Sequence, residues 1–185
     1  ILAGMSYKIA AVPFHFWCPD VYEGAPTPVA ALFSVGPKAA GFALMIRFFY
    51  STLAVGANPA ASVALIDAIN WPLLVAVISA VTMTFGNLVA LRQTNVKRML
   101  AYSTIAHAGF QLLGFVAATP AGYSAAIFYS IVYAVTAMGA FGLVILLGRA
   151  GFEADRLEHF KGLGERSPWF AFLTLVLMLS MAGVP

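Results

Sequence analysis

The longest uncharged stretch of the sequence places the strongest constraint on the fold. No Asp, Glu, Lys or Arg occurs in the 50 residues from Met99 to Gly148. A helix needs about 20 mostly apolar residues to cross a bilayer, so this stretch is long enough for two crossings. Only 9% of all residues are charged, against about 25% in a soluble domain. We therefore exclude a soluble domain and predict an all-α, polytopic transmembrane helix bundle.

The spacing of charges and turn residues divides the chain into a single membrane domain. Both ends lie in apolar sequence, so we expect the chain to be an internal fragment of a longer protein. About six spans are predicted, with a cytoplasmic connector at 149–167; the spans are 1–17, 28–53, 71–91, 99–118, 123–148 and 168–185.

Basic residues orient these spans. The loop Arg92–Arg98 holds three Lys or Arg residues and the stretch Arg149–Ser167 holds four, whereas the turn between them at Thr119–Gly122 holds none. Positively charged loops tend to lie on the cytoplasmic side of a membrane, which places both basic segments there. The stretch Arg149–Ser167 suits either a short helix at the membrane surface or a solvated connector.

Several classes of site are not indicated by the sequence. Cys18 is the only cysteine, so no Cys-based iron–sulfur or zinc motif is present. The fragment Gly162-Leu163-Gly164 lacks the third glycine of a dinucleotide-binding loop. No basic run is interleaved with aromatic residues as in nucleic-acid-binding segments. We expect this chain to bind no metal, no cofactor and no nucleic acid, and to contact the lipid bilayer.

Two lysines, Lys8 and Lys38, fall inside predicted spans. A lysine at the centre of a membrane helix costs about 2.5–3.5 kcal/mol on insertion scales, and such residues usually mark ion or proton pathways. The alternative is that each side chain extends to the membrane surface. An ammonium loses more hydration energy on burial than a neutral amine, so nearby charges decide which form a buried lysine takes.

Prolines predict interruptions of the helices that carry the two lysines. Pro13 follows Lys8 and Pro37 precedes Lys38, and each leaves a helix carbonyl without its usual donor. Gly183-Val184-Pro185 at the end of the chain repeats the pattern of Ala11-Val12-Pro13. Paired interrupted helices are typical of inverted-repeat transporters. The alternative is a set of simple packing kinks.

A third group of polar residues falls in the two spans of the uncharged stretch. Ser103, His107 and Gln111 recur every four positions and share one helical face. A histidine in such a row is suited to passing protons, although packing is the alternative. Tyr129 and Tyr133 on the next span suit hydrogen bonds between helices. Since no predicted span contains Asp or Glu, we expect a carboxylate partner outside this chain.

Three motifs carry a resemblance to a known family. The segments Lys8–Trp17 and Pro19–Val29 strongly resemble the antiporter-like subunits of respiratory complex I. The motif Pro19–Pro28, followed by Lys38–Phe42, looks most like its subunit N branch, and Asn95–Ser103 is shared more widely with cation/proton antiporter subunits. The resemblance implies broken helices within an inverted-repeat antiporter-like fold in a bacterial inner membrane. It implies a proton pathway through Lys8, Lys38 and His107, supported by Ser103, Gln111, His15 and Tyr133. The helix breaks would lie at Pro13, Pro37 and Pro185, and the Pro37 position departs from the usual small residue.

The resemblance also implies a function and a set of partners. It implies a proton-translocating, non-redox subunit of NADH:quinone oxidoreductase, with NADH, FMN, iron–sulfur clusters and quinone held by partner subunits. The main alternative is a subunit of a multisubunit sodium/proton antiporter, in which the same lysines would work without electron transfer. A scaffold subunit that does not conduct protons is a third possibility, which would give two mid-span lysines no role.

Overall fold

The computed structural model describes residues 1–49, 70–148 and 152–183. In these residues the secondary structure is helical apart from one isolated β-bridge, which confirms the predicted all-α class. The elements are α1 (Leu2–Ile9), α2 (Trp17–Gly24), α3 (Thr27–Phe48), α5 (Trp71–Ala90), α6 (Val96–Val116), α7 (Pro120–Leu147), the 3-10 helix η2 (Leu157–Phe160), α8 (Leu163–Arg166) and α9 (Pro168–Met181).

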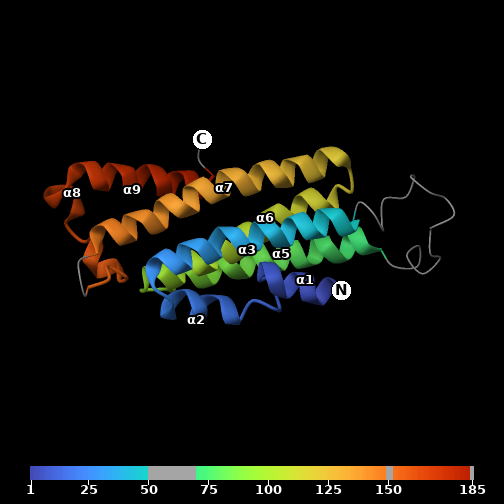
Figure 1. The fold of residues 1–185 in the computed structure, drawn as a ribbon, viewed down its shortest axis with the longest axis horizontal. Helices are drawn as coiled ribbons and strands as arrows, with labels where there is room; N and C mark the ends of the chain where they lie inside the picture. The colour runs from blue at the N-terminus through green and yellow to red at the C-terminus, as the bar shows by residue number, and fades with distance from the viewer. Residues whose placement is uncertain (50–69, 149–151, 184–185) are drawn as a thin grey trace.

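Four helices, α3, α5, α6 and α7, are long and apolar enough to cross a membrane. They lie lengthwise beside one another (Figure 1). Glycines allow α5 and α6 to approach closely, since a Cβ added to Gly86 would lie 2.7 Å from the backbone nitrogen of Ala106. Close backbone contact of this kind is the usual way in which membrane helices associate without a hydrophobic driving force between them.

Side-chain caps fix where three of these helices begin. Asn70, Asn95 and Thr119 each accept a hydrogen bond from a backbone N–H three residues later, at 3.1 Å, as N-cap residues do. The cap at Asn95 starts α6 inside the predicted basic loop. Lys97 and Arg98 consequently lie in the first turn of a membrane helix.

The first helix is interrupted, as the sequence predicts from Pro13. α1 ends at Ile9, Ala10 adopts the left-handed conformation, and α2 does not begin until Trp17. Side chains form hydrogen bonds with two backbone groups near this break. The Val12 N–H donates to Thr82 Oγ1 on α5 at 3.1 Å, and Trp17 Nε1 donates to the Tyr7 carbonyl at 3.2 Å.

The other predicted breaks differ from this one. Pro37 lies inside α3, whose helical assignment runs without interruption from Thr27 to Phe48. Pro185 lies outside the described residues. The break at Pro13 is therefore the one that the structure describes, and α3 presents Lys38 on a continuous helix.

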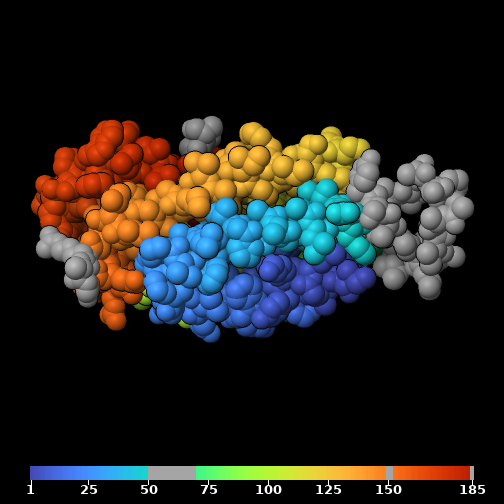
Figure 2. Space-filling view, viewed as in Figure 1, coloured from blue at the N-terminus to red at the C-terminus, as the bar shows by residue number. Residues whose placement is uncertain are grey.

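The helix α3 holds the central position on one face of the molecule. Figure 2 shows α1 and α2 along one side of α3 and α7 along the other. On the far side of α7 lies α9, where Leu177 packs within 2.9 Å of the position that a Cβ on Gly139 would occupy. Side chains on α3 can therefore reach both the interrupted helix and α7.

The connector between α7 and α9 is tied to the start of α6. Asn95 pairs with Arg156 in the isolated β-bridge, and the Leu157 N–H donates to the Thr94 carbonyl at 3.0 Å. The Asn95 side-chain amide also donates to Asp155 at 3.0 Å. The described part of the connector thus packs against the membrane bundle and contains two short helices, η2 and α8.

Candidate functional site

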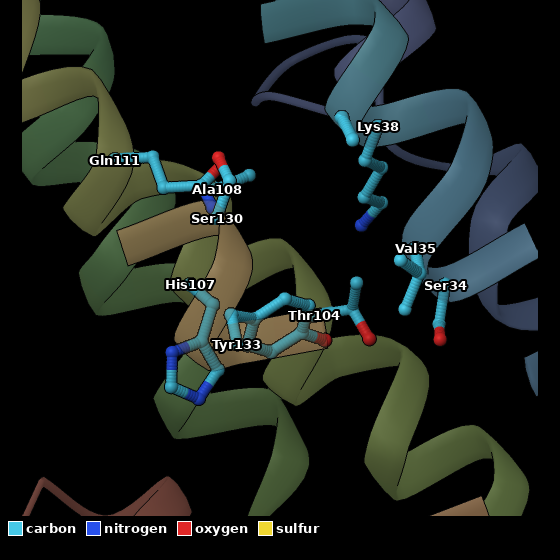
Figure 3. Close-up of a pocket in the computed structure, with 10 residues that line it drawn as sticks. Ser34, Val35, Lys38, Thr104, His107, Ala108, Gln111, Ser130 and Tyr133 are labelled. Carbon is cyan, nitrogen blue, oxygen red and sulfur yellow. The ribbon is translucent and has the colours of Figure 1, made fainter. Parts of the chain in front are cut away.

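A small cavity between α3, α6 and α7 collects polar side chains inside the bundle (Figure 3). Its volume is about 10 Å³, which is near the smallest that holds one water molecule. The lining residues are Ser34, Val35, Lys38 and Ala39 of α3, Thr104, His107, Ala108 and Gln111 of α6, and Ser130 and Tyr133 of α7.

Lys38 is the cation of this cavity. Only 5% of the surface of Lys38 is exposed, and its amine has no hydrogen-bond partner among the described residues. Figure 3 shows the amine pointing from α3 toward Thr104 and Tyr133. Such a group is costly to bury, and most buried polar atoms in proteins have a protein or water partner. Lys38 therefore requires water or a change of protonation to be stable here.

His107 is held by two tyrosines of α7. Its Nδ1 lies 2.6 Å from the hydroxyl of Tyr129, and its ring centroid lies 4.7 Å from that of Tyr133. The Tyr133 hydroxyl is buried and has no hydrogen-bond partner within the part of the chain that the structure describes. The predicted pair of His107 and Tyr133 thus meets at the Lys38 cavity, with the imidazole fixed in orientation.

Of the other polar residues predicted on α6, Gln111 lines the cavity and Ser103 does not, because of the helix geometry. Gln111 is buried and lines the cavity, as does Thr104, whose hydroxyl donates to the Leu100 carbonyl at 2.6 Å. Ser103 is not among the lining residues. Positions separated by four residues drift around a helix of 3.6 residues per turn, and the cavity is accordingly lined by 104, 107, 108 and 111.

Lys8 and His15 lie away from this cavity. Lys8 is exposed on the described chain and lines a second, open cavity of about 450 Å³ between α1 and α3. Its side chain passes Gly41, where an added Cβ would lie 3.3 Å from Lys8 Cγ. His15 is buried in the break beside Phe85, with no partner for its Nδ1. The two predicted lysines therefore line different cavities.

Two serines of the cavity were not predicted from the sequence. Ser34 precedes Lys38 by one helical turn, and Ser130 lies on α7 near Tyr133. Serine is common at contacts between membrane helices, so a serine in an apolar segment does not by itself indicate a functional cavity. The spacing of Ser34 and Lys38 is the signal that could have found the first of them, because residues four apart share a helical face.

A second polar region lies at the start of α6. Lys97 is 4% exposed, and its amine donates to Glu153 Oε2 at 2.6 Å and to the Ala25 carbonyl at 3.0 Å. The hydrogen bond from Lys97 lowers the pKa of the Glu153 carboxyl below its usual value. Arg98 Nη1 lies 2.7 Å from both Asp20 and Glu23 of α2. Here, unlike at Lys38, the cations are paired.

Comparison with known sequences identifies relatives of the whole chain. The family described as "NADH:quinone oxidoreductase/Mrp antiporter, TM" matches residues 1–185. NADH-quinone oxidoreductase subunit N of Thioalkalivibrio sulfidiphilus is 49% identical over 185 residues, which are 100% of this chain and 36% of that protein. The same subunit of Herminiimonas arsenicoxydans is 50% identical over 193 aligned residues, covering 100% of this chain and 37% of that protein.

Solved structures share the fold. Respiratory complex I from Thermus thermophilus with bound Aureothin matches with a TM-score of 0.76 and 35% identity, over 98% of this chain and 36% of that chain. The Mrp complex from Dietzia sp. matches with a TM-score of 0.81 and 26% identity, over 100% of this chain and 32% of that chain.

These matches confirm the predicted resemblance to the antiporter-like subunits and their multi-pass membrane fold with broken helices. The chain spans a little over a third of the length of the curated relatives that it matches. It belongs to the NADH:quinone oxidoreductase/Mrp antiporter membrane family.

Proposed function

We propose that this chain is part of a proton-translocating membrane subunit of NADH:quinone oxidoreductase and that Lys38 carries protons within it. The observation that carries the proposal is the buried Lys38 amine, which has no hydrogen-bond partner among the described residues and lies in a cavity lined by hydroxyl, imidazole and amide side chains. A paired lysine would be fixed in one charge state. An unpaired one changes state when its surroundings change.

The geometry supports proton exchange between Lys38 and the neighbouring side chains. A neutral amine accepts a proton from a water molecule in the cavity and becomes an ammonium, and it later returns that proton to the next acceptor. His107 and Tyr133 are the groups that extend the path, since imidazole nitrogens and phenol oxygens both give and accept hydrogen bonds. Thr104, Ser34 and Gln111 supply polar walls for the water.

Lys8 takes a second role in this proposal. It lies at the surface of the described chain and borders an open cavity, so a carboxylate from another part of the full-length protein could approach it. Approach of that carboxylate would favour the ammonium form, and its withdrawal would release the proton. The break after Ile9 places Lys8 in the last turn of α1, where the helix is interrupted.

The coupling partner lies in other subunits of the complex. We propose that NADH oxidation at FMN, electron transfer through iron–sulfur clusters and quinone reduction take place there, and that this chain contributes no redox group. The protein would lie in the bacterial inner membrane, with the Lys97 end facing the cytoplasm. This orientation rests on the basic residues of 92–98 and 149–167.

Replacement of Lys38 by Ala in the complete enzyme tests the proposal. Inner-membrane vesicles should show a fall of about a hundredfold or more in NADH-driven proton pumping, the lower end of what a positioned proton-transfer group contributes. NADH oxidation with an artificial acceptor should be unchanged, which would show that the complex has assembled. Normal pumping in the assembled variant would reject the role of Lys38.

The similarity to the Dietzia Mrp complex supports a second candidate, a sodium/proton antiporter subunit. The two functions differ in their driving force. Sodium-dependent proton exchange by the full-length protein in vesicles without NADH and quinone would favour the antiporter. Proton movement that requires NADH oxidation would favour the respiratory enzyme.

A further inference from the structure

Buried polar groups continue from the Lys38 cavity toward the Lys97 end of the bundle. Thr27 and Tyr22 are 3% and 0% exposed, and neither hydroxyl has a partner within hydrogen-bonding distance among the described residues. Buried hydroxyls are rarely left unpaired, and ordered water usually supplies the missing partner. The function proposed above leaves both groups unused.

The spacing of these groups gives the path a direction. Thr27, Ser34 and Lys38 share one face of α3 and are all buried. Ser34 lies seven residues after Thr27, and Lys38 lies eleven residues after it. On α6, Thr104 and Ala108 follow Lys97 at the same intervals, and both line the Lys38 cavity. Eleven residues of helix correspond to roughly 16 Å. The path therefore begins at the level of Lys97 and Thr27 and ends at Lys38.

Side chains of α2 lie between the level of Lys97 and Thr27 and the level of Lys38. Cys18 and Tyr22 are buried and lie one helical turn apart. The Cys18 side chain lies near Tyr22 and Lys38, and Tyr22 lies near Tyr133. Polar atoms of α2 thus lie near both the Lys38 cavity and the unpaired hydroxyls that lead away from it.

Glu153 occupies the outer end of this path. Its side chain is 48% exposed, while the Lys97 amine that it contacts is buried. Thr27 lies close to the Glu153 carboxylate. Asp20 and Glu23 are nearby carboxylates, but both are held by Arg98 at the surface. Among these three, Glu153 alone contacts both the solvent and a buried member of the path.

We propose that Glu153 takes up protons from the aqueous side and passes them along Thr27 and Tyr22 to Lys38, with Lys97 holding the carboxylate in position. The inference rests on the function proposed above. The carboxylate accepts a proton from solvent and gives it to a water or hydroxyl beside Thr27, returning to the anion. The proton reaches the neutral Lys38 amine, which becomes an ammonium, and no electron transfer is involved.

The test measures NADH-driven proton pumping in inner-membrane vesicles that contain the complete enzyme with Glu153→Gln. The amide keeps the size of Glu153 and can still accept a hydrogen bond from Lys97, but it cannot take up and release a proton, so pumping should fall by about a hundredfold or more. Glu153→Asp should retain most of the rate. The matched control is Glu158→Gln, which changes an exposed glutamate of the same connector and should leave pumping normal. Equal pumping in Glu153→Gln and the parent would overturn the inference.

An exchange of charges distinguishes a proton carrier from a structural ion pair. The double variant Lys97→Glu with Glu153→Lys restores an ion pair but moves the carboxylate away from the solvent, so pumping should stay low. Recovery to the parental rate would overturn the inference in favour of a purely structural pair. If Glu153→Gln fails to assemble, Thr27→Val removes the next hydroxyl at nearly constant shape and should also slow pumping, and a normal rate there would equally overturn it.

The variant Lys38→Ala separates this inference from the proposed function. Slow pumping in Lys38→Ala with normal pumping in Glu153→Gln would reject only the role of Glu153. Normal pumping in an assembled Lys38→Ala enzyme would reject the proposed function itself.

Discussion

Lys38 and Lys97 are both buried lysines of membrane helices, and they differ in what surrounds the amine. Lys97 contacts a carboxylate and a backbone carbonyl, whereas Lys38 has no hydrogen-bond partner among the described residues. Burial alone therefore does not identify a proton carrier. The absence of a hydrogen-bond partner among the described residues, together with a polar cavity, separates Lys38, which we propose to change its charge, from the paired Lys97.

Replacement of each lysine by arginine should give the largest difference in proton pumping between the Lys38 and Lys97 variants. Lys38→Arg introduces a cation that does not lose its proton in proteins, so NADH-driven pumping should fall by about a hundredfold or more. Lys97→Arg keeps a charge that pairs with Glu153, so pumping should stay near the parental rate. Measurement of proton pumping in vesicles from the two variant strains checks both predictions. Similar losses in both variants would show that the two lysines are not functionally distinct.

Replacement of each lysine by methionine should change stability in opposite directions. Lys38→Met removes a buried amine without a partner and should raise the free energy of unfolding by about 1–3 kcal/mol. Lys97→Met breaks an ion pair whose carboxylate is half-exposed, so solvent screening limits the loss to about 1 kcal/mol. Thermal unfolding of the detergent-solubilised complex, followed at this subunit, provides the measurement. A destabilised Lys38→Met variant would contradict the unpaired state of Lys38.

Removal of the Tyr129 hydroxyl should have a smaller effect on the Lys38 region. Tyr129→Phe deletes the partner of His107 Nδ1 at 2.6 Å and should slow pumping by about threefold, the size of one modest hydrogen bond. Tyr102→Phe, on a partly buried tyrosine of α6 outside the cavity lining, is the control. If both variants pump normally, His107 does not need a fixed orientation.

Acid should affect the Lys97 region by the smallest amount. The pKa of Glu153 lies below its ordinary value of 4.5 because Lys97 donates to the carboxylate. The stabilisation is therefore complete above pH 4.5 and is lost as the pH falls through the lower folded-state pKa. Unfolding temperatures measured from pH 6 down to about pH 3 should drop less steeply in Glu153→Gln than in the parent. Identical slopes would show that the pair makes no measurable contribution.

Much of the fold could be predicted from charge spacing. The uncharged stretch from Met99 to Gly148 contains most of α6 and α7, and Asn70-Trp71-Pro72 marks the start of α5. Lys38 was identified because it interrupts an apolar segment. These predictions succeed because the cost of placing a charge in a membrane acts locally along the sequence.

The remainder depends on contacts between distant residues. Lys97 was predicted to lie in a basic cytoplasmic loop, but Glu153 pairs with it from 56 positions away, and no local pattern reveals that partner. Thr27 and Tyr22 look like ordinary loop and helix residues until α2, α3 and α6 meet. Pro37 predicts a break, yet the helical assignment of α3 continues through it. Tertiary packing, rather than local propensity, decides these positions.

The interruption after Ile9 has an electrostatic consequence. The peptide dipoles of a helix add up to roughly half a negative elementary charge at its C-terminus, and α1 ends inside the bundle with Lys8 in its last turn. The chain thereby places a permanent negative potential beside a lysine without using an acidic side chain. Because this potential comes from the backbone, it does not titrate.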